Sequence, residues 1–140
     1  MSERIESIKA GSVAAFGGML GLLPSALTSN VAPKDQFGDI GVATVTCVLF
    51  GLVYRYAVAA DRNNTQLKGG VVAAFGLTRG LALAQNLVSS APGSRVDAQT
   101  AASAALVAGQ SMLVIAFAAA AIELAFSQGY IQHFGEATKD

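Results

Sequence analysis

Long segments without charged side chains dominate this sequence. No charged residue occurs between Lys9 and Lys34, and residues 10–27 of that interval are apolar over about the length of one bilayer crossing. Three further segments have the same character and contain one charged residue each: residues 40–60, 69–88 and 98–126. As helices that rise about 1.5 Å per residue, all four segments can cross a hydrocarbon core of about 30 Å.

The composition supports the same interpretation. Charged residues make up 13% of the 140 residues, and nine basic residues balance nine acidic ones, whereas a typical soluble domain is roughly one quarter charged. This balance excludes the basic excess of a nucleic-acid-binding protein. A soluble alanine-rich bundle is the alternative, but residues 11–23 and 101–121 offer no charged face to water. We therefore predict an all-α integral membrane four-helix bundle, a single domain over residues 1–140 in contact with membrane lipid.

An internal repeat divides the chain into two hairpins. Shifting the sequence by 59 residues aligns residues 8–22 with residues 67–81, and nine of the fifteen aligned positions are identical. We interpret this as a tandem duplication of a helical hairpin, with repeat 1 over about residues 6–62 and repeat 2 over about residues 63–130. Because each repeat contains two expected helices, both copies enter the membrane in the same direction.

Small residues recur at helix-packing spacing in both repeats. Each copy has a GxxxG pattern at the corresponding place, and the fourth segment has a small-residue stripe of its own. Such residues let helix backbones approach closely in lipid, although glycine is also simply common in membrane helices. The helix-packing candidates are Gly17, Gly21, Gly76, Gly80, Ala105 and Gly109. We expect the glycine pairs to form a close crossing between the first and third helices.

The two repeats differ near the middle of the expected membrane. Arg79 occupies the position of Leu20, and Gln110 occupies that of Gly51. An arginine at this depth costs about 3 kcal/mol or more, so it should face protein, water or an anionic group. Gln110 and the adjacent Ser111 could accept a hydrogen bond from it. Two interpretations stay open for this polar set: a contact that fixes helix or subunit packing, and a gate, anion site or cofactor contact.

Charges near the helix ends predict the orientation of the bundle. Short connections make neighbouring helices antiparallel, so that with four spans both termini lie on one side. That side carries six basic residues, Arg4, Lys9, Arg55, Arg62, Lys68 and Lys139, and the opposite side carries Lys34 and Arg95. The positive-inside rule then places both termini in the cytoplasm or stroma. We expect Arg55 to anchor the interface, with Glu123 as its hypothetical ion-pair partner.

The sequence lacks the usual patterns of an enzyme. It has no glycine-rich phosphate loop with a lysine and no His-Glu-x-x-His pattern. His133 is the only histidine and falls in the polar tail, so a catalytic serine or cysteine lacks an expected base and no zinc site is predicted. We expect neither a catalytic site nor a metal site in this protein.

One stretch of the chain resembles a known class of membrane protein. The run from Tyr54-Arg55-Tyr56 through Asp61-Arg62-Asn63 to residues 67–80 is similar to small four-span thylakoid proteins of cyanobacteria and plastids, over about a quarter of the chain. The resemblance implies association with photosynthetic complexes, through lipid or a pigment such as chlorophyll or carotenoid. Gln85, Asn86 and Gln110 could each ligate a chlorophyll magnesium, and the spacing selects none of them.

Two functions remain open. The first is a non-catalytic accessory or assembly subunit of a larger membrane complex, which by resemblance is photosynthetic, with other integral membrane subunits as partners. The second is a small homo-oligomeric channel or transporter, formed by self-association, in which Arg79 and Gln110 line a polar path. The short expected loops leave little soluble surface for other work, and this favours the first function.

Overall fold

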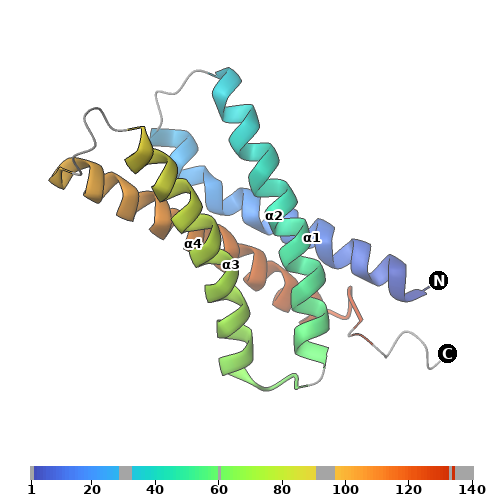
Figure 1. The fold of residues 1–140 in the computed structure, drawn as a ribbon. Coiled ribbons are helices and arrows are strands. Elements are labelled where there is room, and N and C mark those ends of the chain that lie inside the picture. The colour runs from blue at the N-terminus through green and yellow to red at the C-terminus, as the bar shows by residue number, and fades with distance from the viewer. Residues whose placement is uncertain (1, 29–32, 60, 91–96, 133, 135–140) are drawn as a thin grey trace.

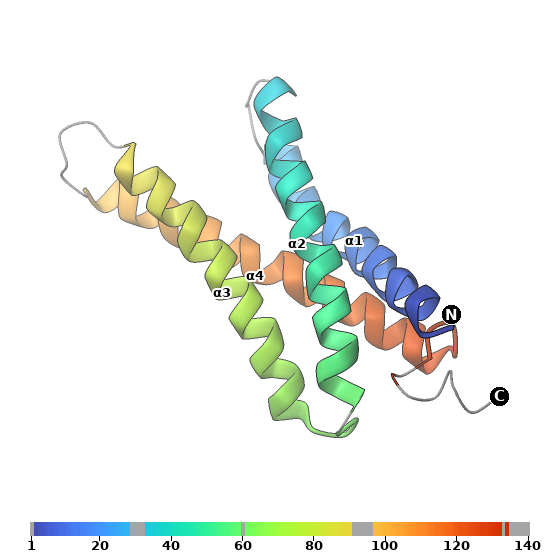
Figure 2. The same ribbon diagram turned by 45° about the vertical axis from the view of Figure 1, so that its right-hand side comes forward.

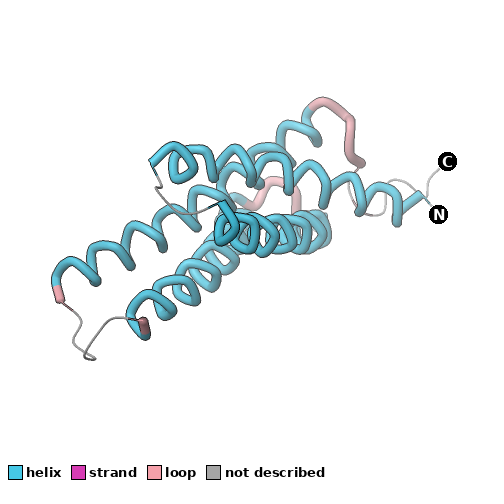
Figure 3. Tube along the Cα trace, turned by 90° about the horizontal axis from the view of Figure 1, so that it is seen from above, coloured by secondary structure: helices cyan, strands magenta, loops and turns pink. Residues whose placement is uncertain are grey.

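The chain folds into four helices. The computed structural model describes residues 2–28, 33–59, 61–90, 97–132 and 134, without the side chains of residues 2, 25–28 and 33–37. The helices are α1 (Ser2–Thr28), α2 (Pro33–Ala59), α3 (Thr65–Ser89) and α4 (Ala98–Ser127) (Figure 1). Only short turns accompany them in the described part of the chain (Figure 3). The predicted all-α class is confirmed, while Ala60, Arg95, His133, Lys139 and the side chain of Lys34 lie outside the described residues.

Three of the helices have the length and apolar character needed to cross a membrane. These segments are Gly38–Ala59 of α2, Thr65–Ser89 of α3 and Ala98–Ser127 of α4, and the described part of α1 is not among them. Large apolar side chains are nevertheless exposed on all four helices, and Phe16 and Leu106 are 73% and 74% exposed. The outer surface is therefore apolar, which is the character expected of a surface that meets lipid or other proteins.

Side-chain caps define the beginnings of α3 and α4. Asn64 accepts the backbone N–H of Leu67 at 2.9 Å, and Asp97 accepts that of Thr100 at 2.7 Å. Hydrogen bonds from the side chain and the backbone N–H of Thr100 lower the pKa of Asp97. Each cap satisfies a donor that the helix leaves unpaired, and such caps stabilise a helix by about 1 kcal/mol. The Asn64 amide also donates to Asp61 at 3.0 Å, which closes the turn between α2 and α3.

The other helices are arranged around α4. α1 runs antiparallel beside α4, α3 packs against α4, and α2 packs on α1 (Figures 1 and 2). α2 and α3 approach each other at the Asp61–Asn64 turn and then diverge, as both views show. The main buried cluster lies where these helices meet and includes Phe50 of α2 and Ile115 of α4. The bundle is thus packed at one end and open between α2 and α3 at the other.

Gly17 and Gly21 bring α1 into close contact with α4. A Cβ atom at Gly17 would lie 2.5 Å from the Cβ of Ala121 and 2.8 Å from the Phe117 carbonyl oxygen. A Cβ atom at Gly21 would lie 2.7 Å from the Cα of Val114. These distances are shorter than van der Waals contact, so the observed separation of the two helices requires glycine at both positions.

Gly76 and Gly80 pack against the same helix from the other hairpin. A Cβ atom at Gly80 would lie 3.0 Å from the Cα of Ala108, and one at Gly76 would overlap the sulfur atom of Met112. The predicted close crossing of the first and third helices is therefore wrong, because both glycine pairs face α4. That prediction assumed two equivalent hairpins. In the structure α4 contacts α1 of the first hairpin as well as α3 of its own, whereas α2 meets α3 mainly near their shared turn.

Ala105 and Gly109 are not used for packing within the described part of the chain. Both residues are exposed, and a Cβ atom at Gly109 would meet no atom within 4 Å. α3 instead packs against the adjacent face of α4, at Ala108 and Met112. The expected stripe on α4 therefore faces away from the other described helices.

Candidate functional site

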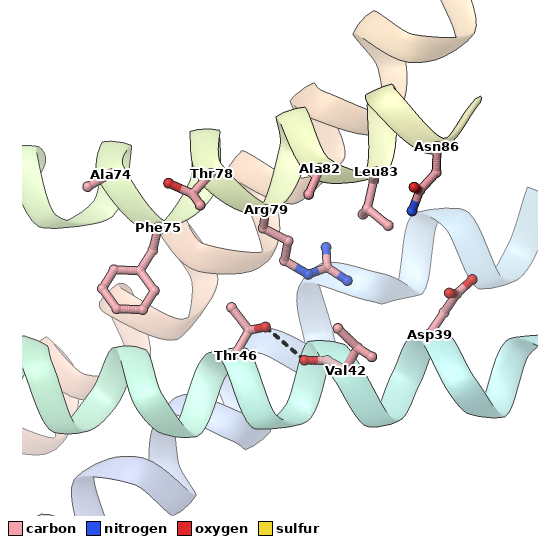
Figure 4. Close-up of a pocket in the computed structure, with 10 residues that line it drawn as sticks. All are labelled: Asp39, Val42, Thr46, Ala74, Phe75, Thr78, Arg79, Ala82, Leu83 and Asn86. Carbon is pink, nitrogen blue, oxygen red and sulfur yellow. Dashed lines mark hydrogen bonds between the residues drawn. The ribbon is translucent and has the colours of Figure 1, made fainter. Parts of the chain in front are cut away.

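The divergence of α2 and α3 leaves a cleft between them, which we take as the candidate functional site. Its volume is about 610 Å³, and its walls come from the first half of α2 and from residues 74–86 of α3 (Figure 4). Half of the residues that line it are apolar: Val42, Ala74, Phe75, Ala82 and Leu83. The polar ones are Asp39, Thr46, Thr78, Arg79 and Asn86. The cleft is thus an apolar space that contains one cation and one anion.

Arg79 projects from α3 across the cleft toward α2 (Figure 4). Its Nη1 atom donates a hydrogen bond to the hydroxyl oxygen of Ser111 on α4, at 3.1 Å. Its Nε atom is buried and has no hydrogen-bond partner among the described residues. An unpaired buried donor costs about 1–3 kcal/mol, and a guanidinium has five N–H donors. The side chain therefore retains donors for a further oxygen atom in the cleft.

The structure places Ser111, and not Gln110, within hydrogen-bond distance of Arg79. Ser111 is fully buried on the side of α4 that faces Arg79, whereas Gln110 is half-buried. Successive residues of a helix point about 100° apart, so one residue of the expected pair faces Arg79 and its neighbour does not. The polar set at this depth is therefore Arg79 with Ser111.

The two ends of the cleft differ in character. Asp39 and Asn86 flank one end, near the beginning of α2 and the end of α3 (Figure 4). At the other end Phe75 packs edge-on against buried Phe50, with ring centroids 5.5 Å apart, and Phe50 contacts Tyr54 at 5.2 Å. The cleft therefore has a polar end and an end that meets packed aromatic rings.

A second polar cluster surrounds Arg55, which is fully buried. Arg55 forms an ion pair with Glu3 at 2.6 Å and donates to the Ser7 hydroxyl at 2.8 Å, both on α1. Its Nε atom donates to the backbone carbonyl of Gln132 at 3.0 Å, beyond the end of α4. This one side chain joins α2 to the beginning of α1 and to the segment that follows α4.

The expected roles of Arg55 and Glu123 are wrong. Arg55 has no exposed surface, so it is not an interface anchor, and its ion-pair partner is Glu3. Glu123 instead accepts a hydrogen bond from the Tyr54 hydroxyl at 2.7 Å and pairs with Lys68 at 2.9 Å. Tyr54 and Arg55 are neighbours in α2 and point in different directions, one toward α4 and the other toward α1. Glu123 therefore contacts Tyr54 and does not pair with Arg55.

Glu6 belongs to the same cluster. Its carboxylate accepts the backbone N–H of Gln132 at 2.9 Å and pairs with Lys9 at 2.7 Å. Burial opposes the ionisation of Glu6, but these hydrogen bonds and the charges of Lys9 and Arg55 outweigh it and lower the pKa from its ordinary value of 4.5. The cluster therefore holds Glu6 as a carboxylate.

Sequence reasoning missed Glu3 and Ser7 as partners of Arg55, and Glu6 as a partner of Lys9 and Gln132 in the same cluster. The signal for two of them was present, because residues 3 and 7 lie one turn apart on the same face of a helix. Its contact with Arg55 could be identified only once α1 was placed beside the end of α2. The spacing alone does not say which of the basic residues at this end the carboxylates meet.

The candidate cofactor ligands differ in position. Within the part of the chain that the structure describes, no group of three His, Cys, Asp or Glu residues could hold a metal ion. Of the amides considered for chlorophyll, Asn86 lines the cleft, Gln85 is exposed and Gln110 is half-buried. Asn86 is therefore the amide of this set that shares a cavity with Arg79.

The fold and the cleft define an all-helical protein with three apolar helices of membrane-spanning length and a cationic side chain between two of them. Compared with models of protein families, with curated proteins and with solved structures, the chain matches none of them. Its own residues therefore carry the functional assignment.

Proposed function

We propose that this protein is a non-catalytic integral membrane subunit, with all four helices in the bilayer, that associates with other membrane subunits. The apolar length of α2, α3 and α4 supports the membrane placement. α1 is included because Gly17 and Gly21 hold it antiparallel against α4. The basic residues Arg4, Lys9 and Lys68 lie at the end where the Arg55 cluster forms, and by the positive-inside rule this end faces the cytoplasm or stroma.

The observation that carries the proposal is an uncovered small-residue stripe on α4, formed by Ala101, Ala105 and Gly109. All three residues are exposed, and the position of a Cβ atom at Gly109 is open. The glycine pairs of α1 and α3, which have the same spacing, are covered by a neighbouring helix. Small residues allow close helix approach in lipid, where apolar burial supplies little attraction. The stripe therefore offers a docking face for a helix of another subunit.

A matched pair of variants tests this docking face. Gly109→Leu blocks the stripe, and Ser103→Leu adds the same side chain at an exposed position of α4 about 120° around the helix from Gly109. The wild-type protein and Ser103→Leu should migrate with a larger complex on a native gel after mild detergent extraction. Gly109→Leu should migrate alone while keeping the helicity of the wild type. A wild-type protein that always migrates alone, or a Gly109→Leu protein that stays in the complex, contradicts the proposal.

We extend the proposal to a photosynthetic complex on the resemblance of residues 54–80 to thylakoid proteins. An absorbance spectrum of the same native-gel band tests this extension. Chlorophyll or carotenoid bands that follow the protein through a second separation support it. A complex without either pigment restricts the proposal to a membrane complex of another kind.

The cleft favours a second candidate, a small channel or transporter. The favouring observation is that Arg79, a cation, lines a space of about 610 Å³ between two apolar helices. A transporter should run alone as a symmetric oligomer and pass solute in liposomes. Flux that Arg79→Leu abolishes, in a protein that keeps its helicity, would replace the accessory-subunit proposal with this one.

A further inference from the structure

We propose that the cleft between α2 and α3 binds a long-chain fatty acid, with the carboxylate on Arg79 and the alkyl chain along the apolar walls. This inference rests on the membrane placement proposed above and adds a ligand to it. The starting observation is that Arg79 makes one hydrogen bond, to Ser111, while its buried Nε has no partner among the described residues.

The chemistry of the guanidinium selects the head of the ligand. A guanidinium presents parallel N–H donors that match the two oxygens of a carboxylate. Ser111 accepts from Nη1 and Nε is covered by the protein, so the Nη2 donors of the guanidinium remain for a ligand oxygen. Away from water this charge-assisted contact is stronger than in solution. An anionic head therefore pairs with a half-buried cation that donates one hydrogen bond to the described residues.

The position of Asp39 indicates how deep in the cleft the ligand carboxylate lies. Asp39 and Asn86 flank the outer end of the cleft, and Arg79 lies about 10 Å further in along α3, at about 1.5 Å per residue. A ligand anion that stayed beside Asp39 would meet a like charge, and one beside Arg79 meets an opposite charge. The charge pattern therefore favours a bound position in which the carboxylate lies beside Arg79, deeper than the outer end of the cleft.

The size of the cleft selects one alkyl chain. At roughly 30 Å³ for each water-sized group, a volume of about 610 Å³ accommodates about 20 heavy atoms. A long-chain fatty acid has about this many, and a two-chain phospholipid has more than twice as many. An alkyl chain that leads outward from Arg79 would contact Val42 and Leu83, whereas Phe75 closes the inner end of the cleft (Figure 4).

The cleft opens sideways, where the proposed bilayer lies. Val42, Thr78 and Ala82 line the cleft and are themselves exposed on the surface of α2 and α3. A fatty acid dissolved in the bilayer could therefore enter between the two helices without crossing the packed end at Phe75.

Binding of radiolabelled palmitate to the full chain in phosphatidylcholine nanodiscs tests the proposal. Two variants change the cleft in different ways: Arg79→Gln removes the charge, and Ala82→Phe fills space at its exposed rim. The controls are Arg62→Gln, at the exposed turn, and Ala116→Phe, on α4 outside the cleft. We expect saturable binding by the wild type and by both controls. The Kd should rise about tenfold or more in each cleft variant, and hexadecanol, with the same chain and no charge, should compete at least about tenfold less well than palmitate.

Several results would overturn the proposal. Equal palmitate affinity in Arg79→Gln, equal competition by hexadecanol, or no saturable binding by helical wild-type protein would each do so. Displacement of palmitate by phosphatidylglycerol in the nanodisc would identify a phospholipid headgroup as the ligand and would also overturn it. The two proposals fail separately, because Gly109 lies outside the cleft: Gly109→Leu tests partner binding, and the cleft variants test palmitate binding.

Discussion

Adding one methyl group at Gly17 tests how closely α1 and α4 approach. In Gly17→Ala the new Cβ would lie 2.5 Å from the Cβ of Ala121 and 2.8 Å from the Phe117 carbonyl oxygen. Ordinary contacts between carbon atoms are about 3.5–4.0 Å, so the variant is short by about 1 Å. Both opposing atoms are fixed to the backbone of α4, so the relief must come from a shift of one helix. Overpacking of this kind costs about 1–3 kcal/mol.

Gly109→Ala is the matched control for this prediction. It adds the same methyl group to a helix interior, with no atom within 4 Å of the new Cβ. Both substitutions gain about 0.5–1 kcal/mol because alanine favours a helix more than glycine does. That gain cancels between the two variants, so their unfolding free energies should differ by the overpacking cost, about 1–3 kcal/mol.

Titration with sodium dodecyl sulfate in mixed micelles, followed by circular dichroism, measures the difference. Gly17→Ala should unfold at lower denaturant than Gly109→Ala. Ala121→Gly itself costs about 0.5–1 kcal/mol of helix propensity, but it should be less destabilising in Gly17→Ala than in the wild type, because there it also removes the nearer contact and leaves the Phe117 carbonyl. Equal midpoints for Gly17→Ala and Gly109→Ala would show that α1 and α4 are not in the described contact.

Two further predictions concern the Arg55 cluster. Arg55→Met removes the buried partner of Glu3 and Ser7 and should cost about 3–5 kcal/mol in the same titration. Arg4→Met, at an exposed position of α1, should stay within about 0.5 kcal/mol, and similar losses in both variants would contradict a buried ion pair. Because folding lowers the pKa of Glu6, its stabilisation is present above 4.5 and is lost as the pH falls through the folded-state pKa. Glu6→Gln should therefore flatten the acid side of the stability profile, and an unchanged profile would refute the role given to Glu6.

The helices themselves were predictable because their signal is local. Residues 98–126, for example, form an apolar segment with one charge, and a helix satisfies its backbone hydrogen-bonding groups whatever it packs against. Arg79 could also be singled out from the sequence, because a cation inside an apolar segment must find a polar neighbour wherever the helix packs. Ser111 was among the candidates for that neighbour and lies at 3.1 Å from Arg79.

The partners of individual residues were less predictable because they depend on how the helices are placed. The spacing of Gly17 and Gly21 says that a helix can come close, but it does not say which helix does. The repeat suggested a symmetric packing of the two hairpins. The observed packing is not symmetric, because α1 and α3 both pack against α4 but pack differently against α2. For the same reason the sequence could not show whether Arg55 or its neighbour Tyr54 contacts Glu123. In the structure the two side chains face different helices, Tyr54 toward α4 and Arg55 toward α1.

The contact of Gly17 with Ala121 sets an order for biosynthesis. The two residues are 104 positions apart, so at about 5–20 residues per second the ribosome needs roughly 5–20 s to supply the second after the first. During that interval the glycine face of α1 lacks the helix that covers it in the folded protein, and so does that of α3 from the time α3 is made. Insertion factors and other subunits in the membrane therefore have access to both faces before α4 arrives, and α4 then covers both.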